Sequence, residues 1–240
     1  MFRHKGKSRN FMHNLGVASL LSFVAGIVNV VGFLSIQKLT TNVTGHFAFM
    51  VEEALKINFA QSIFYFLYIF FFFAGAFFSN FVIEVAGKVS DKNIYFVPVV
   101  IESAILMMIS FLNFSFINNH PNFIACCLLF AMGLQNALVT IISNSVVRTT
   151  HLTGLFTDLG IEFSQLFFYK DDEHRNKLIS SIKLRFTIVF TFFIGGIIAG
   201  LLYHEIQMKT LILASMILII GLGIDYFIIR LRLKKLRRTN

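Results

Sequence analysis

Long apolar segments separated by short polar stretches run through the whole chain. Six of them reach the length of about 20 residues that a helix needs to cross the apolar core of a bilayer. Their approximate limits are residues 12–36, 59–86, 94–117, 123–147, 184–203 and 211–229. Because lipid offers no hydrogen-bond partners to the backbone, such continuous segments are expected to be helical. The pattern predicts an all-α membrane protein with six transmembrane helices.

A Thr-rich motif occurs twice, after the first predicted helix and after the fourth. The two copies read TTNVTGHF and TTHLTGLF and begin at Thr40 and Thr149. Three predicted helices separate them, so the two halves of the chain cross the membrane in opposite directions. We therefore predict a 3+3 inverted repeat within a single membrane domain, 1–240. The first repeat covers about 12–117, the second about 122–230, and a basic cytoplasmic tail follows at 231–240.

Other positions fit the same division. Gly and Asn stand three apart in GIVN (26–29) and GLQN (133–136), provided that two residues are inserted before the second Thr motif. FFAGAFFS (72–79) and FFIGGIIA (192–199) match in the second helix of each half, and their small residues favour close helix packing. The small residues expected at helix contacts are Gly75, Ser79, Gly196 and Gly200, and the matched acids after the Thr motifs are Glu53 and Glu162.

A short apolar segment follows each Thr-Gly pair, HFAFMVEEALKI in the first half and LFTDLGIEFSQLFF in the second. Each is too short to span a bilayer and too apolar for a solvated loop, so we expect a re-entrant or interfacial helix in both places. Thr44 and Thr153 are expected to cap these helices. The amides of Gly45 and Gly154 would then remain accessible.

The helix breaks are the expected ligand site. A helix N-terminus inside a protein-lined cavity carries free amides and about half a positive charge, which suits an anion or a polar ligand. Transporters with inverted repeats place substrate sites at such breaks. The predicted substrate-binding residues are Asn29, Thr40, Thr41, Thr44, Gly45, Asn136, Thr149, Thr150, Thr153 and Gly154. The alternative is that these residues only cap helices and tie neighbouring segments together.

One acid lies well inside a predicted span. An ionisable side chain is costly in a membrane, so Glu102 in the third predicted helix is the expected site for a proton or a coupling cation. The alternative is a protonated carboxyl group that bonds a neighbouring helix. No His or Cys spacing resembles a metal site, and the adjacent Cys126 and Cys127 are expected to pack as small apolar residues. No catalytic motif is present, so we expect no cofactor and no enzymatic activity.

The basic residues lie in the connections and at the ends of the chain. The net charge is +9, but this placement is the topology signal of a membrane protein and not a nucleic-acid-binding surface. With a cytoplasmic N-terminus, only Lys38, Lys56 and Lys209 of the 21 Lys and Arg lie outside. We therefore predict that both termini are cytoplasmic. A composition that is 56% hydrophobic and 14% charged makes the lipid bilayer the expected partner, and the basic tail is expected to bind anionic headgroups.

The Gly-x-x-Asn and Thr-Gly motifs, together with AMGLQNA (131–137) and TTHLTG (149–154), resemble the YoaK family of bacterial inner-membrane proteins. The resemblance covers about residues 15–229. It implies a multi-pass protein of the bacterial inner membrane whose activity is uncharacterised and whose suspected role is transport. The common family pattern of the first motif is Met-Thr-Gly-Asn, and in this chain His46 stands where that pattern has the Asn.

Two classes of function fit these expectations. The first is a secondary transporter of a small polar molecule or ion, in which the two halves exchange roles around a central site by alternating access. Six helices form a thin wall around such a pathway, so a homodimer is an open alternative to a monomer. The second class is a membrane adaptor or sensor without flux, for which only the connection 148–185 offers sizeable binding surface.

Overall fold

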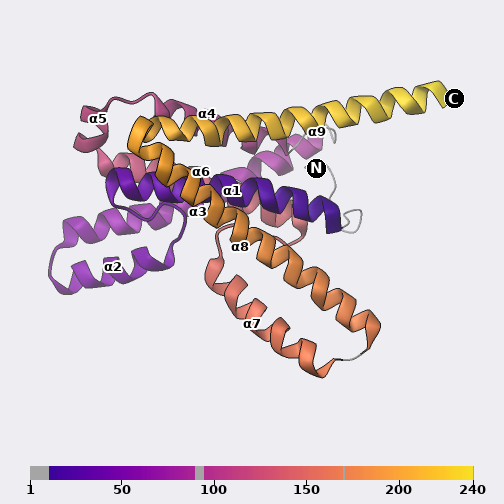
Figure 1. Ribbon diagram of the computed structural model, residues 1–240. Helices are drawn as coiled ribbons and strands as arrows, with labels where there is room; N and C mark the ends of the chain where they lie inside the picture. The colour runs from indigo at the N-terminus through magenta and orange to yellow at the C-terminus, as the bar shows by residue number, and fades with distance from the viewer. Residues whose placement is uncertain (1–10, 90–94, 170, 240) are drawn as a thin grey trace.

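The computed structural model describes residues 11–89, 95–169 and 171–239, which form helices joined by short connections (Figure 1). No β-strand occurs among these residues, so the expected all-α class is confirmed. The elements are α1 (Phe11–Ile36), α2 (Thr44–Leu55), α3 (Phe59–Val89), α4 (Phe96–Ser110), α5 (Phe114–Asn119), α6 (Pro121–Ser143), α7 (Leu152–Phe168), α8 (Asp172–Ile206), the 3-10 helix η2 (Gln207–Thr210) and α9 (Leu211–Thr239).

Within the described residues, four helical stretches are long and apolar enough to cross a membrane. They are Phe11–Ile36 in α1, Phe59–Lys88 in α3, Pro121–Ser143 in α6, and Asp172–Phe227, which runs through α8, η2 and α9. These stretches indicate a membrane protein. The chain reverses direction at η2 (Figure 1), so α8 and α9 lie where the fifth and sixth spans are expected.

The third predicted span is not one helix. α4 ends at Ser110 and a separate helix, α5, begins at Phe114, so the prediction for residues 94–117 is wrong, and residue 94 itself lies outside the described residues. With 15 residues, α4 is about 22 Å long, less than the roughly 30 Å of a bilayer core. The physical reason is Asn113, whose side chain accepts a hydrogen bond from the Phe116 amide and starts a new helix.

The two ends of the chain bear on the predicted orientation. The basic tail continues α9 as a helix to Thr239, and this end of α9 projects beyond the other helices in Figure 1. Several basic residues used for the orientation lie outside the described residues, namely Arg3, Lys5, Lys7, Arg9, Lys92 and Lys170.

The central helices are α1 and α6. Most of their apolar residues are buried, whereas most apolar residues of α3 and α8 are half-buried or exposed. α1 packs along α8, α3 packs along α6, and α4 packs along α9. α1 and α6 also contact each other, and α1 touches α9 while α6 touches α4.

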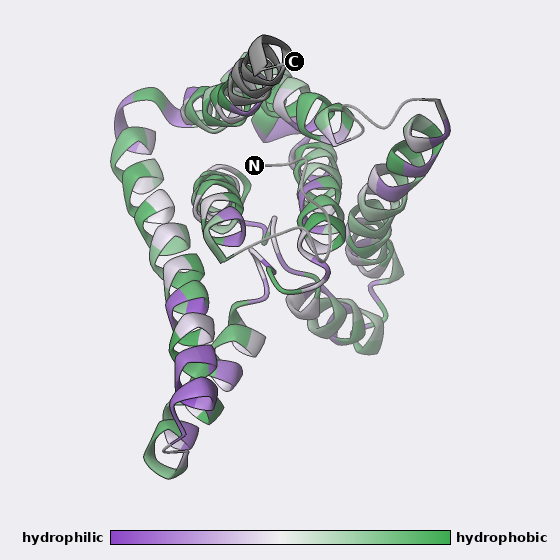
Figure 2. Ribbon diagram, turned by 90° about the vertical axis from the view of Figure 1, so that its right-hand side faces the viewer, coloured by the Kyte–Doolittle hydropathy of each residue, from purple (hydrophilic) through white to green (hydrophobic). Residues whose placement is uncertain are grey.

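The outer faces of α3 and α8 are rich in phenylalanine. Phe73, Phe77 and Phe81 follow one another along α3, Phe186 and Phe190 do the same on α8, and all five are exposed. Apolar residues cover most of the length of the long helices (Figure 2). Water is a poor solvent for so extensive an apolar surface, whereas lipid chains suit it.

Glycines allow α1 and α8 to approach until their backbones touch. A Cβ added to Gly26 would lie 2.0 Å from the carbonyl oxygen of Phe192, and one added to Gly195 would lie 2.2 Å from that of Phe23. Each helix therefore presents a glycine to the backbone of the other. The expected contact residue Gly196 lies at the same contact, because its amide nitrogen is 3.0 Å from the Cβ position of Gly26. A Cβ added to Gly196 itself would lie 3.0 Å from Val30 Cγ2 and 3.8 Å from the Gly26 oxygen.

The same arrangement joins α3 and α6. A Cβ added to Gly133 would lie 2.1 Å from the Phe72 oxygen, and one added to Gly75 would lie 2.1 Å from the Phe130 oxygen. Gly75 was expected at such a contact, and its predicted role in close packing is confirmed. Both helix pairs are therefore held at backbone contact, where any added methyl group forces them apart.

Replacing Gly26 by Ala is expected to lower the free energy of unfolding by about 2 kcal/mol, because two backbones must separate to admit the methyl group. Gly160→Ala in α7 is the matched control, since nothing lies within 4 Å of a Cβ added there. The control is expected to be neutral or to gain up to about 1 kcal/mol from the better helix propensity of Ala. Thermal unfolding of both variants in one detergent measures the difference, and equal midpoints would contradict the packing.

Candidate functional site

The chain turns back on itself directly after α1. Gln37 has a φ of 55°, and the residues that follow run back along the helix. Thr40 Oγ1 donates to the Val28 carbonyl oxygen over 3.1 Å, and Thr41 Oγ1 donates to Asn29 Oδ1 over 2.7 Å. Because a helix rises about 1.5 Å per residue, these contacts lie about 10 Å from the end of α1. The first break is therefore re-entrant with respect to α1.

A second reversal follows α6. Asn144 has a φ of 55°, and the chain again runs back along the helix that it has just left. Thr150 Oγ1 donates to Asn136 Oδ1 over 2.8 Å, and Thr149 Oγ1 accepts from Gln135 Nε2 over 3.3 Å. Both Thr side chains of the second motif are thus fixed to α6, as those of the first motif are fixed to α1.

The two Thr-Asn hydrogen bonds occupy matched positions. Each joins the second Thr of a motif to the Asn of the preceding Gly-x-x-Asn. The bonded residues are 12 apart in the first half and 14 apart in the second, which is the two-residue insertion that aligning the motifs requires. The sequence placed these Thr and Asn residues in one predicted ligand site without pairing them. In the structure the two pairs hold each break against its helix.

The expected helix caps are wrong. Val43 precedes α2 and His151 precedes α7, and neither makes a side-chain capping bond. Thr44 and Thr153 instead lie in the first turns, where they are exposed. In the first half Asn42 Oδ1 accepts from the Gly45 amide over 3.3 Å. The capping prediction failed because the chain enters each helix one or two residues earlier than the Thr-Gly pair indicates.

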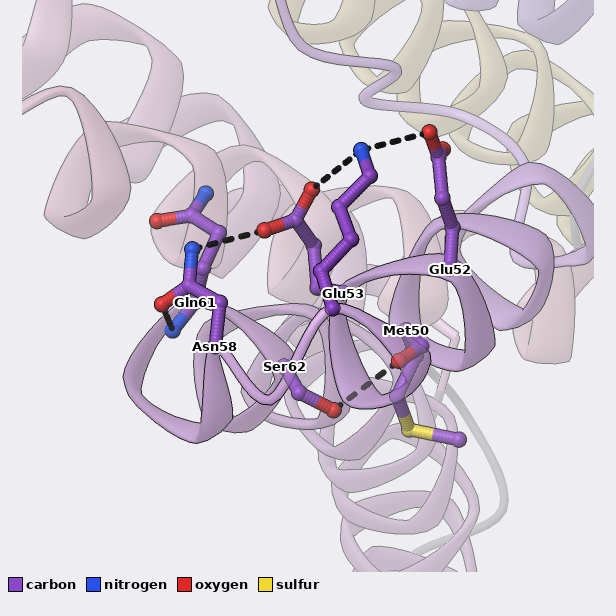
Figure 3. Close-up of polar contacts among 7 residues, drawn as sticks. Met50, Glu52, Glu53, Asn58, Gln61 and Ser62 are labelled. Atoms are coloured by element: carbon purple, nitrogen blue, oxygen red, sulfur yellow. Dashed lines mark hydrogen bonds and ion pairs between the residues drawn. The ribbon is translucent and has the colours of Figure 1, made fainter.

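The matched acids connect each short helix to the long helix that follows it. Glu53 Oε2 accepts from Asn58 Nδ2 over 2.7 Å at the turn between α2 and α3, where Lys56 Nζ also lies 3.3 Å from Glu53 Oε1 (Figure 3). Glu162 of α7 pairs with Arg185 of α8. Glu53 and Glu162 therefore lie at the same place in each half, where the short helix meets the long helix that follows, but they bind different partners.

Glu102 lies beside the midpoint of α4 and is fully buried. Neither carboxyl oxygen has a hydrogen-bond partner among the described residues, so the alternative, a bond to a neighbouring helix, does not form. The adjacent Ser103 is bonded reciprocally with Ser215 of α9, since each hydroxyl donates to the backbone oxygen of the other residue, over 3.1 and 2.9 Å. An unpaired buried carboxylate costs several kcal/mol, so a proton or a bound cation has to neutralise Glu102.

Sequence reasoning missed Gln135. Its Nε2 donates to the Leu21 carbonyl oxygen of α1 over 3.0 Å and to Thr149 over 3.3 Å, so one side chain joins both central helices and the second break. Its Oε1 is buried without a partner. A Gln inside an apolar run, next to the Asn of GLQN, was the available signal.

His46 is the one buried residue of α2, a helix too short to span a bilayer. Its Nε2 lies 2.7 Å from the Leu39 carbonyl oxygen, and its ring packs 5.9 Å from that of Tyr65 and 5.0 Å from that of Tyr68. Burial lowers the pKa of the imidazole, so the neutral ring donates from Nε2. His46, which stands where the common family pattern has an Asn, therefore holds α2 against α3.

Comparison with known protein families finds one match. A family model described as "Protein of unknown function (DUF1275)" matches residues 17–224. The chain belongs to this family. The matched region contains both Thr motifs, Glu102 and Gln135, and the family description gives no activity. No curated protein and no solved structure matches the chain significantly. The YoaK name stays a prediction. Among the described residues, no group of three or more His, Cys, Asp or Glu is placed to hold a metal ion.

A double-mutant cycle tests the bond between Thr41 and Asn29. Thr41→Val is expected to cost about 1 kcal/mol, and its coupling to Asn29→Ala is expected to be about 0.5–1.5 kcal/mol, as for hydrogen bonds in other membrane proteins. Thr44→Val, at an exposed Thr of the same motif, is the control and is expected to be neutral. Unfolding in detergent measures all four variants. A coupling energy of zero would show that the bond is not formed.

Acidification tests the burial of His46. The pKa of His46 is lowered in the folded protein. As the pH falls below the ordinary His pKa of 6.5, the imidazole is therefore protonated in the unfolded chain before it is protonated in the folded one. Stability is full above that pH and falls as the pH drops toward the folded-state pKa, by at most about 1.4 kcal/mol per pH unit. His46→Gln is expected to flatten the curve of stability against pH in this window. His151→Gln, at an exposed ring, is expected to leave the slope unchanged.

Proposed function

We propose that the chain is a secondary transporter of a small polar molecule or ion that works by alternating access. The main observation that supports this proposal is the matched pair of re-entrant breaks, each fixed to its helix by a Thr-Asn hydrogen bond. In this proposal the chain has six spans, with α4 as a short third span and with α8 and α9 as the fifth and sixth. Broken helices of this kind hold substrate sites in transporters with inverted repeats.

The helix contacts support a 3+3 inverted repeat. If the halves are exchanged, α1 takes the place of α6, α3 that of α8, and α4 that of α9. The pair α1 and α8 then becomes α6 and α3, and these are the two pairs joined by glycines at backbone contact. The reciprocal bonds of Ser103 and Ser215 lie where α4 and α9 meet. A local two-fold axis between these serines accounts for all of these contacts.

Alternating access follows from two equivalent arrangements of nearly equal energy. Each break is held by few hydrogen bonds, whereas the glycine contacts fix α1 to α8 and α3 to α6 as rigid pairs. Rocking of one pair against the other opens one break while the other stays closed. The half-buried Asn29 and Asn136 and the Thr hydroxyls beside them would meet a ligand in the opened half.

Glu102 supplies the coupling in this proposal. Its carboxyl group lies midway along α4 and has no internal partner, so its charge state depends on which side admits a proton or a cation. Neutralisation permits the buried arrangement, and ionisation favours the one in which water reaches the carboxylate. Both termini lie in the cytoplasm of a bacterial inner membrane in this scheme.

Purified protein in proteoliposomes tests transport directly. The probes are acetate, succinate, L-alanine, uridine and Na⁺, applied as concentration jumps while charge movement is recorded. We expect current with at least one probe and a reduction of roughly tenfold or more in Glu102→Gln, because the amide takes up no proton. Glu84→Gln, at an exposed acid of α3, is the control and is expected to match the wild type. Folded wild-type protein that gives no current with any probe would contradict transport and favour an adaptor or sensor.

A further inference from the structure

A cavity of about 310 Å³ lies beside the second break. Its walls come from the residues that follow α6, from the first turns of α7 and from α8. The polar residues that line it are Ser145, Arg148, His151, Asp158 and Arg185, with Gly154 on the same wall. His151 and Gly154 belong to the second Thr motif, and the other lining residues lie outside it.

The charges of this cavity are separated. Arg185 directs Nε and Nη2 to Asp158 Oδ2, over 3.2 and 3.1 Å, and directs Nη1 to Glu162. Both contacts to Asp158 fall on Oδ2, and this side chain is 49% exposed, so Oδ1 is available to a ligand. Asp158 and Glu162 together outweigh the single charge of Arg185. This end of the cavity is therefore negative.

The opposite end is positive. Among the described residues Arg148 has no carboxylate partner, and its Nη1 lies 3.5 Å from His151 Nδ1. The imidazole sits against the first turn of α7, 3.0 Å from the position of a Cβ on Gly154. Gly154 and Asp158 are one helical turn apart, so the two ends are separated by about 6 Å. The positive end of the α7 dipole adds to the field at the same end.

The first half of the chain carries no charge at the equivalent positions. When the Thr-Gly and Phe-Phe-x-Gly motifs of the two halves are aligned, Asp158 corresponds to Phe49 and Arg185 to Tyr65. There the rings of Phe49 and Tyr65 pack 5.4 Å apart and join α2 to α3 without any ion pair. These two positions are aromatic in the first half and charged in the second.

We propose that this cavity binds a small zwitterion with an amino group and a carboxylate, such as a short α-amino acid. The carboxylate lies against Arg148 and His151, and the ammonium group lies against Asp158 Oδ1. A neutral but dipolar solute matches a cavity whose lining has Arg148 at one end and Asp158 with Arg185 at the other. Glu162 lies outside the lining and neutralises Arg185 through their ion pair, which leaves the carboxylate of Asp158 for the ammonium group. That the bound zwitterion is then transported rests on the proposed function. This inference adds the class of substrate that the transporter carries.

Binding is measured on the full chain in detergent, without flux. The probes are L-alanine, acetate and methylamine, which carry both groups, the carboxylate alone and the ammonium alone, and inorganic phosphate. We expect L-alanine to bind about tenfold or more tightly than each of the others, because only it satisfies both ends. Acetate or phosphate binding as tightly as L-alanine would overturn the zwitterion in favour of a simple anion site. Absence of L-alanine binding at millimolar concentration would also overturn it.

Two variants locate the bound ligand. Arg148→Gln leaves the ion pairs of Arg185 in place and is expected to weaken L-alanine binding about tenfold or more. Asp158→Asn is expected to weaken L-alanine binding while leaving acetate binding unchanged. Lys177→Gln, at an exposed residue of α8, is the matched control. Unchanged L-alanine affinity in Arg148→Gln would place the ligand elsewhere.

Failure of this inference is distinguishable from failure of transport. L-alanine binding that Arg148→Gln weakens, without current in proteoliposomes, would retain the cavity and reject the transporter. Current from another probe, with L-alanine neither bound nor transported, would retain the transporter and reject this ligand class.

Discussion

A break in a helix inside an apolar environment exposes backbone groups that have no water to bind. In this protein side chains bind such groups: His46 Nε2 donates to the Leu39 carbonyl oxygen in the first break, and Ser143 Oγ accepts from the Val147 amide in the second. The Thr hydroxyls hold each broken segment against the helix that it has just left. The positions of α2 and α7 follow from these two reversals, because each short helix begins where the returning segment ends. The proposed ligand binding and the proposed coupling through Glu102 both require that the two breaks are stable in the same structure.

The helix pairs α1 with α8 and α3 with α6 are held more firmly than the two breaks. Glycines place the backbones of α1 and α8, and of α3 and α6, in direct contact, and such contacts tolerate little sliding. The breaks are held by a few hydrogen bonds, each contributing about 1 kcal/mol. In the proposed transport cycle motion would concentrate between the pairs, across the bond from Gln135 of α6 to the backbone of α1.

The two halves have diverged at one joint. In the first half aromatic rings and a buried imidazole hold α2 against α3, and in the second half Arg185 holds α7 against α8 through two acids. Packed rings exclude water, whereas a partly exposed ion pair admits a polar ligand and responds to its charge. The same repeat thus offers a closed joint on one side and a charged cavity on the other.

The sequence alone determined the helical class, the apolar segments and the grouping of the Thr motifs with Asn29 and Asn136, because hydropathy and repeated motifs are local properties of a chain. The pairing of Thr41 with Asn29 and of Thr150 with Asn136 came from the structure. It misplaced the helix caps and the end of α4, since single residues such as Asn113 decide where a helix starts. Only the tertiary structure decided that the Thr hydroxyls are engaged internally and that Gln135 bridges two helices. It also decided that Asp158 and Arg185 share one cavity, because these contacts depend on which distant segments meet.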